Sequence, residues 1–158
     1  MVYSLSIDPS IRSCGWAIWK GKELKEYGVF RSSTSKEKDW QKAGLQIGGL
    51  MSDKGKEWKV LRVFCEYPAF FGANATANSG ALIKLSWFVG FLNGLFIPEF
   101  VEFNLIPVNT WKGQLPKHVV QERIERILPE LVIKSMRKMP ADVFDAVGIG
   151  LYCHGRMR

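Results

Sequence analysis

The stretch that decides the fold is YSLSIDPSIRSCGWAIWKGKELKEYGVF, which occupies residues 3–30. It holds three segments with the character of strands, at 3–7, 15–20 and 24–30, because short apolar runs alternate with turn-forming residues. Turn signals stand at Asp8-Pro9-Ser10 and at Gly21-Lys22. Strands joined by such short turns run antiparallel, so the N-terminal third of the chain predicts a three-strand meander.

The rest of the chain alternates between helical and extended patterns. The run at 60–65 is almost continuously apolar, which predicts a strand buried on both faces. The other expected elements are a helix at 40–51, a basic loop at 54–59, a loop at 67–78, a helix at 81–97, a strand at 101–108, a helix at 117–128, a basic link at 134–138 and a last helix that opens at Pro140. This order predicts one α/β domain spanning residues 1–158, a mixed five-stranded sheet flanked by helices.

Composition fits one globular domain with a polyanionic partner. The 158 residues are 47% apolar and 23% charged, which excludes bulk disorder, and the formal net charge of +7 favours nucleic acid as a partner. Three cysteines in a chain without a visible secretory signal indicate reduced thiols and a cytoplasmic location, in a bacterial cell or a phage-infected host. The apolar segment 81–97 is short for a membrane span and contains Lys84, so we expect a buried helix and no membrane partner.

Four acidic residues stand in apolar company, whereas most of the fifteen lie among lysines and arginines. Asp8 and Glu66 end apolar strands, and Asp142 and Asp145 lie three residues apart on one face of the last helix. Each alone has an ordinary explanation as a turn former, a cap or a partner of the helix dipole. Together they favour a shared site, because clustered carboxylates need cations between them and suit Mg²⁺ or Mn²⁺. Two such ions about 4 Å apart catalyse displacement at phosphorus.

These residues also carry a resemblance to RuvC-type Holliday junction resolvases, in the RNase H-like nuclease superfamily. The matching motifs are SIDPSIRSCGW at 6–16, VFCE at 63–66, ALIKL at 81–85 followed by Gly90, and PADVFDA at 140–146. The resemblance implies an RNase H-like fold, catalysis and metal binding by Asp8, Glu66, Asp142 and Asp145, and two Mg²⁺ or Mn²⁺ ions per active site. Ser10 departs from the family's usual glycine, and the compact segment 107–117 looks more like phage members.

Basic and aromatic residues near these motifs are the expected contacts to DNA. The predicted nucleic-acid-binding residues are Arg12, Phe70, Phe71, Lys84, Lys112, Lys117, Arg137 and Lys138. Lys117 best matches a family lysine near the active site. The aromatic pair would stack on unpaired bases. For each lysine, simple solvation stays open as an alternative, and one of the two phenylalanines is expected to cover the core instead.

The helix at 81–97 is apolar around most of its circumference and therefore needs cover on most sides. A narrow stripe of small or polar residues runs along it, formed by Ser86, Gly90, Asn93 and Gly94. We expect a twofold homodimer through this helix, with Trp87, Phe88 or Phe91 among the contacts, in agreement with the family's dimerisation through the same region. Complete burial within one chain is the alternative.

The leading functional hypothesis is a metal-dependent endonuclease that resolves four-way DNA junctions by paired cleavage and leaves 5′ phosphates. The alternatives are an RNase H-like nuclease acting on other branched DNA or on RNA–DNA hybrids, and a non-catalytic nucleic-acid-binding module. An actin-like sugar kinase has a similar first acidic motif, but it needs two such domains, for which 158 residues do not suffice. No nucleotide cofactor is therefore expected.

Overall fold

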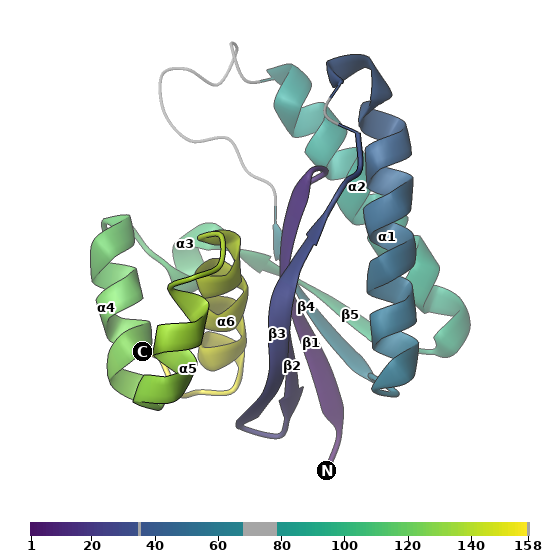
Figure 1. Ribbon diagram of the computed structural model, residues 1–158. Coiled ribbons are helices and arrows are strands. Elements are labelled where there is room, and N and C mark those ends of the chain that lie inside the picture. The colour runs from purple at the N-terminus through teal and green to yellow at the C-terminus, as the bar shows by residue number, and fades with distance from the viewer. Residues whose placement is uncertain (35, 68–78, 158) are drawn as a thin grey trace.

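The computed structural model describes residues 1–34, 36–67 and 79–157, and its centre is a mixed five-stranded sheet (Figure 1). The strand order is β3-β2-β1-β4-β5. The first three strands are antiparallel neighbours, and β4 and β5 run parallel to β1. The strands are β1 (Tyr3–Asp8), β2 (Ser13–Lys20), β3 (Glu23–Arg31), β4 (Arg62–Tyr67) and β5 (Glu102–Pro107). The predicted mixed sheet with an antiparallel meander is confirmed.

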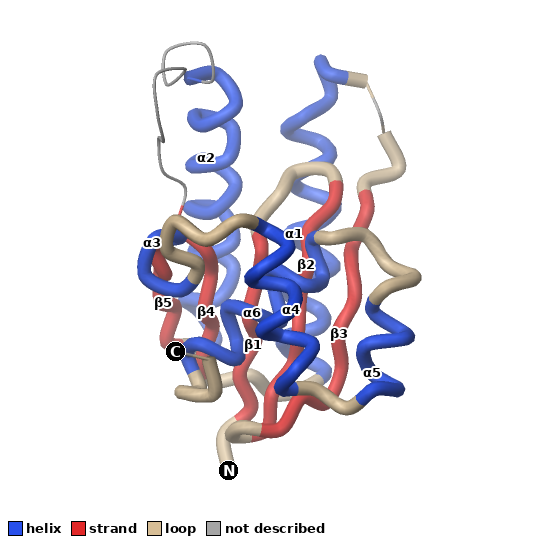
Figure 2. The backbone as a smooth tube through the Cα atoms, turned by 90° about the vertical axis from the view of Figure 1, so that its left-hand side faces the viewer, coloured by secondary structure: helices blue, strands red, loops and turns tan. Residues whose placement is uncertain are grey.

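Helices cover both faces of the sheet (Figures 1 and 2). One face carries α1 (Trp40–Glu57) and α2 (Ser79–Phe96). The other carries α3 (Val108–Trp111), α4 (Lys117–Ile127), α5 (Glu130–Met136) and α6 (Asp142–Cys153). Two short 3-10 helices, Glu37–Asp39 and Ile97–Glu99, flank α1 and α2. Each face has its own apolar core, so the central strands are buried on both sides.

Side-chain alternation along β1 determines which residues face α6. Leu5 and Ile7 belong to the core under α1 and α2. Ser6 points the other way, because its hydroxyl donates to the carbonyl of Ala146 in α6 at 2.7 Å. Asp8 is two residues beyond Ser6 and therefore lies on the same face, at the C-terminal end of the strand.

Gly15 of β2 allows α6 to approach the sheet closely. It pairs with Asp8 across the antiparallel ladder. A Cβ placed on Gly15 would lie 2.1 Å from the carbonyl oxygen of Asp142. No side chain fits at that distance, so the absence of a side chain here brings the first turn of α6 next to the end of β1.

Replacing Gly15 with alanine is therefore expected to destabilise the protein by about 1–3 kcal/mol, the usual cost of an overpacked core. Thermal unfolding should show a lowered melting temperature. Gly49 of α1 is the matched control, since an added Cβ there meets nothing within 4 Å. Gly49→Ala should leave the melting temperature unchanged or raise it, and an equal loss in both variants would contradict the packing argument.

Two charged segments that were expected to be loops are helical. α1 continues to Glu57, so the predicted basic loop at 54–59 is wrong over its first four residues. The predicted link at 134–138 is wrong over its first three residues, because α5 extends to Met136 and buries Ile133 and Met136. Lys134 pairs with Glu130 one turn earlier, so its charge stays in solvent while the apolar residues face the core.

The aromatic residues of α2 pack on α1 of the same chain, not on a free surface. An added Cβ at Gly44 would lie 2.8 Å from the ring of Trp87, and one at Gly48 would lie 2.4 Å from Phe91. Phe88 is fully buried. The prediction that Phe88 contacts a second copy is therefore wrong, and Trp87 and Phe91, which are half-buried, point mainly toward α1.

One helix among the described residues, Gly80–Glu99, is long and apolar enough to cross a membrane by length and composition alone. It packs on α1 and the sheet through Phe88, Leu92 and Phe96. Only 22% of this segment is buried within the chain, and its exposed side consists mostly of small or polar residues, among them Ser86, Gly90 and Asn93.

Candidate active site

Four carboxylates meet where the C-terminal ends of β1 and β4 face the start of α6. Asp8 ends β1, and Glu66 lies in the neighbouring strand one position beyond the paired residues Ile7 and Cys65. Asp142 and Asp145 occupy the first turn of α6, which reaches this edge over Gly15. The sequence places all four residues at element ends, and the fold brings those ends together.

Polar partners fix three of these carboxylates. The hydroxyl of Ser13 donates to Asp142 Oδ2 at 2.7 Å. The indole of Trp111 donates to Glu66 Oε2 at 3.0 Å, and the ammonium of Lys112 lies 3.1 Å from Asp145 Oδ1. Ser13 and Trp111 were not among the predicted site residues. Each acts on an acid that is far away in sequence, so no local pattern could have identified them.

Burial and the mutual repulsion of the four carboxylates shift the pKa values of Asp8 and Glu66. Burial raises the pKa of Asp8 well above its ordinary value, and the charges of Asp145, Glu66 and Asp142 raise it further, while Lys112 opposes them. Burial also raises the pKa of Glu66, against the hydrogen bond from Trp111. Beside burial, the three neighbouring carboxylates make it unfavourable to charge Asp8, and a cation bound among them would offset this repulsion.

The donor set suits a hard divalent cation, because all four facing groups are carboxylates. Among the residues that the structure describes, however, no three His, Cys, Asp or Glu side chains form a group ready to hold one ion. Three of the acids instead bond Ser13, Trp111 and Lys112. The residues fit a metal site in chemistry, and loading would exchange some of these protein contacts for metal contacts.

The raised pKa of Asp8 implies that the stability of the folded protein depends on pH. Since the folded protein holds this proton more tightly than the unfolded chain, the stabilising contribution is complete at low pH and is lost as pH rises through the raised pKa. At neutral pH without metal, Asp8→Asn should therefore raise the melting temperature, and the gain should shrink toward pH 4. Asp53→Asn changes an exposed carboxylate on α1 and is the control. Equal melting temperatures for wild type and Asp8→Asn at pH 7 would contradict the burial of a charged Asp8.

The predicted basic residues fall into three groups. Lys112 and Lys117 flank the acids, with the Lys117 ammonium 3.9 Å from Asp145 Oδ2. Arg12 and Lys84 lie together on the α1–α2 side of the sheet, where both contact Glu37. Arg137 is paired with Glu125 of α4 through two hydrogen bonds, and Lys138 is exposed beside it. Phe70 and Phe71 lie outside the described residues.

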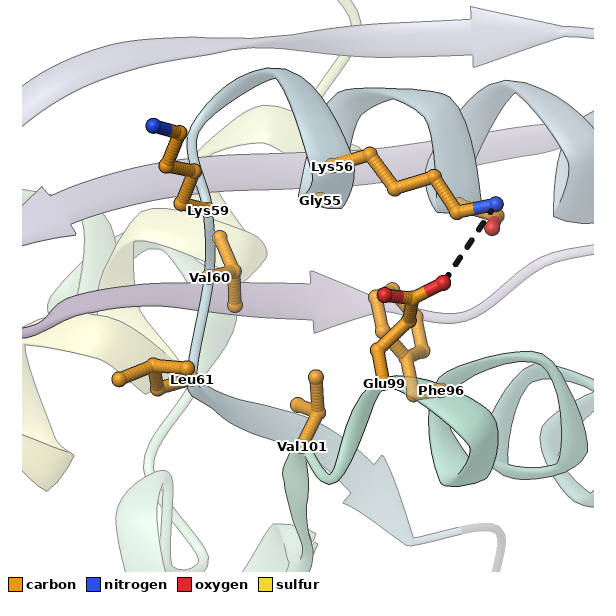
Figure 3. Close-up of a pocket in the computed structure, with 9 residues that line it drawn as sticks. Gly55, Lys56, Lys59, Val60, Leu61, Phe96, Glu99 and Val101 are labelled. Atoms are coloured by element: carbon orange, nitrogen blue, oxygen red, sulfur yellow. Dashed lines mark ion pairs between the residues drawn. The ribbon is translucent and has the colours of Figure 1, made fainter.

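A cavity of about 230 Å³ lies where β4 and β5 begin, at the opposite end of these strands from Glu66, and Figure 3 shows the residues that line it. It is enclosed by the end of α1, the end of α2 and the segments that lead into β4 and β5, with Phe96 and Val60 in its wall. An ion pair of 3.8 Å between Lys56 and Glu99 crosses its rim. None of the four carboxylates lines it, so it takes no part in the candidate active site.

Comparison with known proteins identifies the fold. No protein-family model and no curated protein matches the chain. The structure of Thermus thermophilus RuvC in complex with a Holliday junction substrate superimposes with a TM-score of 0.70 at 18% identity, covering 100% of this chain and 99% of that one. A fowlpox virus resolvase in complex with substrate Holliday junction DNA gives a TM-score of 0.65 at 13% identity, covering 98% and 99%.

The yeast mitochondrial Holliday junction resolvase Ydc2 superimposes with a TM-score of 0.61 at 13% identity, covering 98% of this chain and 77% of that one. Bacterial, viral and mitochondrial resolvases thus share the topology of this chain over almost its whole length. The chain has the RuvC-type, RNase H-like fold that its motifs predict.

Proposed function

We propose that this protein is a divalent-metal-dependent endonuclease that resolves four-way DNA junctions. The observation that carries the proposal is the meeting of Asp8, Glu66, Asp142 and Asp145 at one edge of the sheet, on a fold shared with junction resolvases. The positive net charge of +7 supports a nucleic acid as the substrate.

The four acids would hold the metal, and the neighbouring residues would orient them. Two Mg²⁺ or Mn²⁺ ions bound there would activate water and stabilise the leaving 3′ oxygen, so that a 5′ phosphate remains. Ser13 and Trp111 restrict the rotation of Asp142 and Glu66 through their hydrogen bonds. Such supporting bonds typically change metal affinity or activity 10- to 100-fold. Lys112 and Lys117 place positive charge next to Asp145, where a scissile phosphate would need it.

A cleavage assay tests this proposal directly. A four-way junction, a fork, a linear duplex and an RNA–DNA hybrid of equal length are incubated with the protein and Mg²⁺, Mn²⁺ or EDTA. We expect cleavage of the junction in paired positions, dependence on the metal and 5′-phosphate ends. Preferred cleavage of the fork or of the hybrid would show that this DNA or hybrid, and not the junction, is the substrate. Absence of cleavage with retained binding would indicate a non-catalytic module.

A homodimer is part of this proposal, because two strands of a junction must be cut and one chain has one acid cluster. The uncovered side of α2 carries Ile83, Ser86, Gly90 and Asn93, and Ile97 of the following 3-10 helix continues the row at alternating spacings of three and four residues. This is the spacing of a close helix pair. Ile83 and Ile97 are 67% and 64% exposed, and the residues between them are small or polar. The contact is thus proposed through this stripe and not through the aromatic residues that face α1.

Salt dependence separates the basic residues that meet DNA from those that do not. Lys117→Ala should weaken junction binding and reduce the slope of log affinity against log salt by about 0.9, the value for one lost phosphate contact. Arg137→Ala should weaken binding less, because Glu125 already neutralises that guanidinium. Lys134→Ala on α5, which is paired with Glu130, has the same charge change and is the control. If junction affinity and its salt slope are unchanged in both the Lys117 and the Arg137 variant, DNA binds to another part of the protein surface.

A reducing compartment fits the cysteines. All three are free thiols, and Cys14 and Cys65 are buried. Burial raises the pKa of the Cys153 thiol to about 12, so it is protonated at neutral pH. We place the protein in the cytoplasm on this ground together with its proposed DNA substrate.

A further inference from the structure

A groove of about 440 Å³ lies on the α1 and α2 side of the sheet and begins one residue after Asp8. From Pro9 it extends to the first turns of both helices. Its apolar wall comes from Ile11, Trp40 and Leu85. Arg12 and Lys84 line it as well, so aromatic and cationic groups share one concave surface. The proposed cleavage mechanism does not use this groove.

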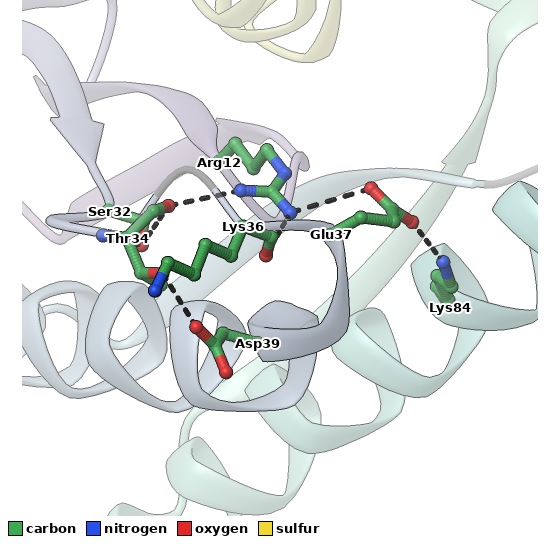
Figure 4. A network of polar contacts seen from close by, with 7 residues as sticks. All are labelled: Arg12, Ser32, Thr34, Lys36, Glu37, Asp39 and Lys84. Atoms are coloured by element: carbon green, nitrogen blue, oxygen red, sulfur yellow. Dashed lines mark hydrogen bonds and ion pairs between the residues drawn. The ribbon is translucent and has the colours of Figure 1, made fainter.

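Glu37 bridges the two cations of the groove (Figure 4). Its carboxylate is hydrogen-bonded to the Lys84 ammonium, and its other oxygen lies 3.5 Å from the Arg12 guanidinium. The Lys84 contact holds the pKa of Glu37 below its ordinary value, so the bridge is a charged one. The Glu37 side chain is 77% exposed, and ion pairs that exposed are weak. Another anion can therefore replace this carboxylate at small cost.

Arg12 is fixed in place independently of Glu37. Its Nη1 donates to the carbonyl of Thr34 at 3.0 Å, and its Nη2 donates to the carbonyl of Lys36 at 2.8 Å. Thr34 is held in turn by its hydroxyl bond to Asp39. A guanidinium has five N–H donors, so these two bonds leave donors for an anion. The backbone carbonyls thus orient a preformed anion site that Glu37 occupies in this structure.

Trp40 supplies an aromatic surface next to that anion site. Its ring packs edge-on against Trp87 with centroids 5.2 Å apart, which fixes its orientation. The Lys84 ammonium lies 5.7 Å from the Trp40 ring centroid. An aromatic side chain beside two cations is the combination that binds single-stranded nucleic acid, because a base stacks while its phosphate meets the charges.

We propose that this groove binds an unpaired nucleotide of the DNA substrate, with its base against Trp40 and its phosphate between Arg12 and Lys84, and that Glu37 occupies the phosphate position until DNA displaces it. The inference rests on the proposed function and deepens it. A base inside a continuous duplex is stacked and does not reach Trp40, whereas a branch point supplies unpaired bases. Stacking on Trp40 is available only to such a nucleotide, so the groove favours branched over linear DNA, while Glu37 lowers the affinity of the groove for its occupant.

The first test compares two variants with the same charge change. Glu37→Gln removes the competing carboxylate, and Glu130→Gln removes an exposed carboxylate that pairs with Lys134 on α5. Binding to a four-way junction and to a linear duplex is measured in Ca²⁺ over a range of salt concentrations. We expect Glu37→Gln to bind the junction about three- to tenfold more tightly than Glu130→Gln does. The added substitution Arg12→Ala should abolish this gain. Equal affinities for the two glutamine variants would overturn the role of Glu37.

The second test identifies the occupant of the groove. Binding of a four-nucleotide oligothymidylate is measured by calorimetry with wild type, Trp40→Phe and Trp40→Leu. We expect the phenylalanine variant to retain binding and the leucine variant to lose it about tenfold, since only the former keeps a ring for stacking. Equal binding by the leucine variant, or equal binding of inorganic phosphate and the oligonucleotide, would overturn the nucleotide site.

These outcomes are distinct from failure of the proposed function. Oligothymidylate binding is measured without cleavage, so it tests the groove even if the protein cleaves no junction. Conversely, wild-type junction cleavage can persist while Glu37→Gln and Glu130→Gln behave alike, and this result would refute the groove and leave the nuclease intact.

Discussion

Replacement of Asp8 with asparagine is expected to reduce junction cleavage by at least about 10³-fold, while junction binding persists or strengthens. Metal-ion catalysis provides several kcal/mol of transition-state stabilisation, and each 1.36 kcal/mol is a factor of ten in rate. Asp8 lies at the centre of the acid cluster, since Asp145, Glu66 and Asp142 all raise its pKa. Removal of the Asp8 carboxylate should therefore weaken the binding of each metal ion that the four acids would hold together. The amide removes a negative charge facing the DNA, so affinity is not expected to fall.

Single-turnover cleavage and junction binding in Ca²⁺ measure the two effects separately. Asp53→Asn, the exposed control on α1, should cleave like wild type. The raised melting temperature expected for Asp8→Asn at neutral pH would show that the loss of cleavage is not unfolding. Wild-type turnover by Asp8→Asn would remove the assignment of the acid cluster as the active site.

The second large effect concerns assembly: wild type is expected to sediment at about twice 17.9 kDa, and Gly90→Arg at the mass of one chain. Gly90 lies in the middle of the exposed stripe of α2, and an added Cβ there meets nothing within 4 Å in the same chain. A large charged side chain is thus harmless within one chain, but it would prevent the close approach of a second α2. Paired cleavage should be replaced by single nicks in the same junction.

Gly49→Arg on α1 is the matched control for Gly90→Arg. It is also an exposed helical glycine with open space around its Cα, and the substitution improves helix propensity by the same amount. This variant should remain dimeric and resolve junctions by paired cuts. A single 17.9 kDa species for wild type without DNA, or an unchanged dimer for Gly90→Arg, would contradict the proposed interface.

The acids of the site were predictable from sequence because each one interrupts an apolar pattern. Asp8 and Glu66 end runs that otherwise read as buried strands, and Asp142 and Asp145 share a helical face. Their partners carry no such signal. Ser13 is one hydroxyl in a serine-rich turn, and Trp111 is one of six tryptophans in the chain. Only the approach of α6 and α3 to the sheet gives these two residues their role.

The surface proposed for a dimer was even harder to predict from the sequence than the partners of the acids. Periodicity assigns an outer face when one side of a helix is clearly polar, but α2 is apolar around most of its circumference, and its narrow stripe of small or polar residues does not by itself show which side a neighbouring helix covers. The large aromatic residues were the natural candidates for an interface. They face α1 instead, because Gly44 and Gly48 leave room for Trp87 and Phe91. The exposed side is the stripe of small residues, which only the packing of α1 against α2 reveals.

The meander, the two further strands, the four acids and the basic character were all predictable from sequence, because local alternation and charge are properties of neighbouring residues. The direction of the two further strands, the partners that hold the acids, the exposed side of α2 and the link that Glu37 makes between Arg12 and Lys84 became visible only in the folded structure. These contacts link residues 25 to 129 positions apart. Nothing local specifies such pairs, since they form only when the helices settle on the two faces of the sheet.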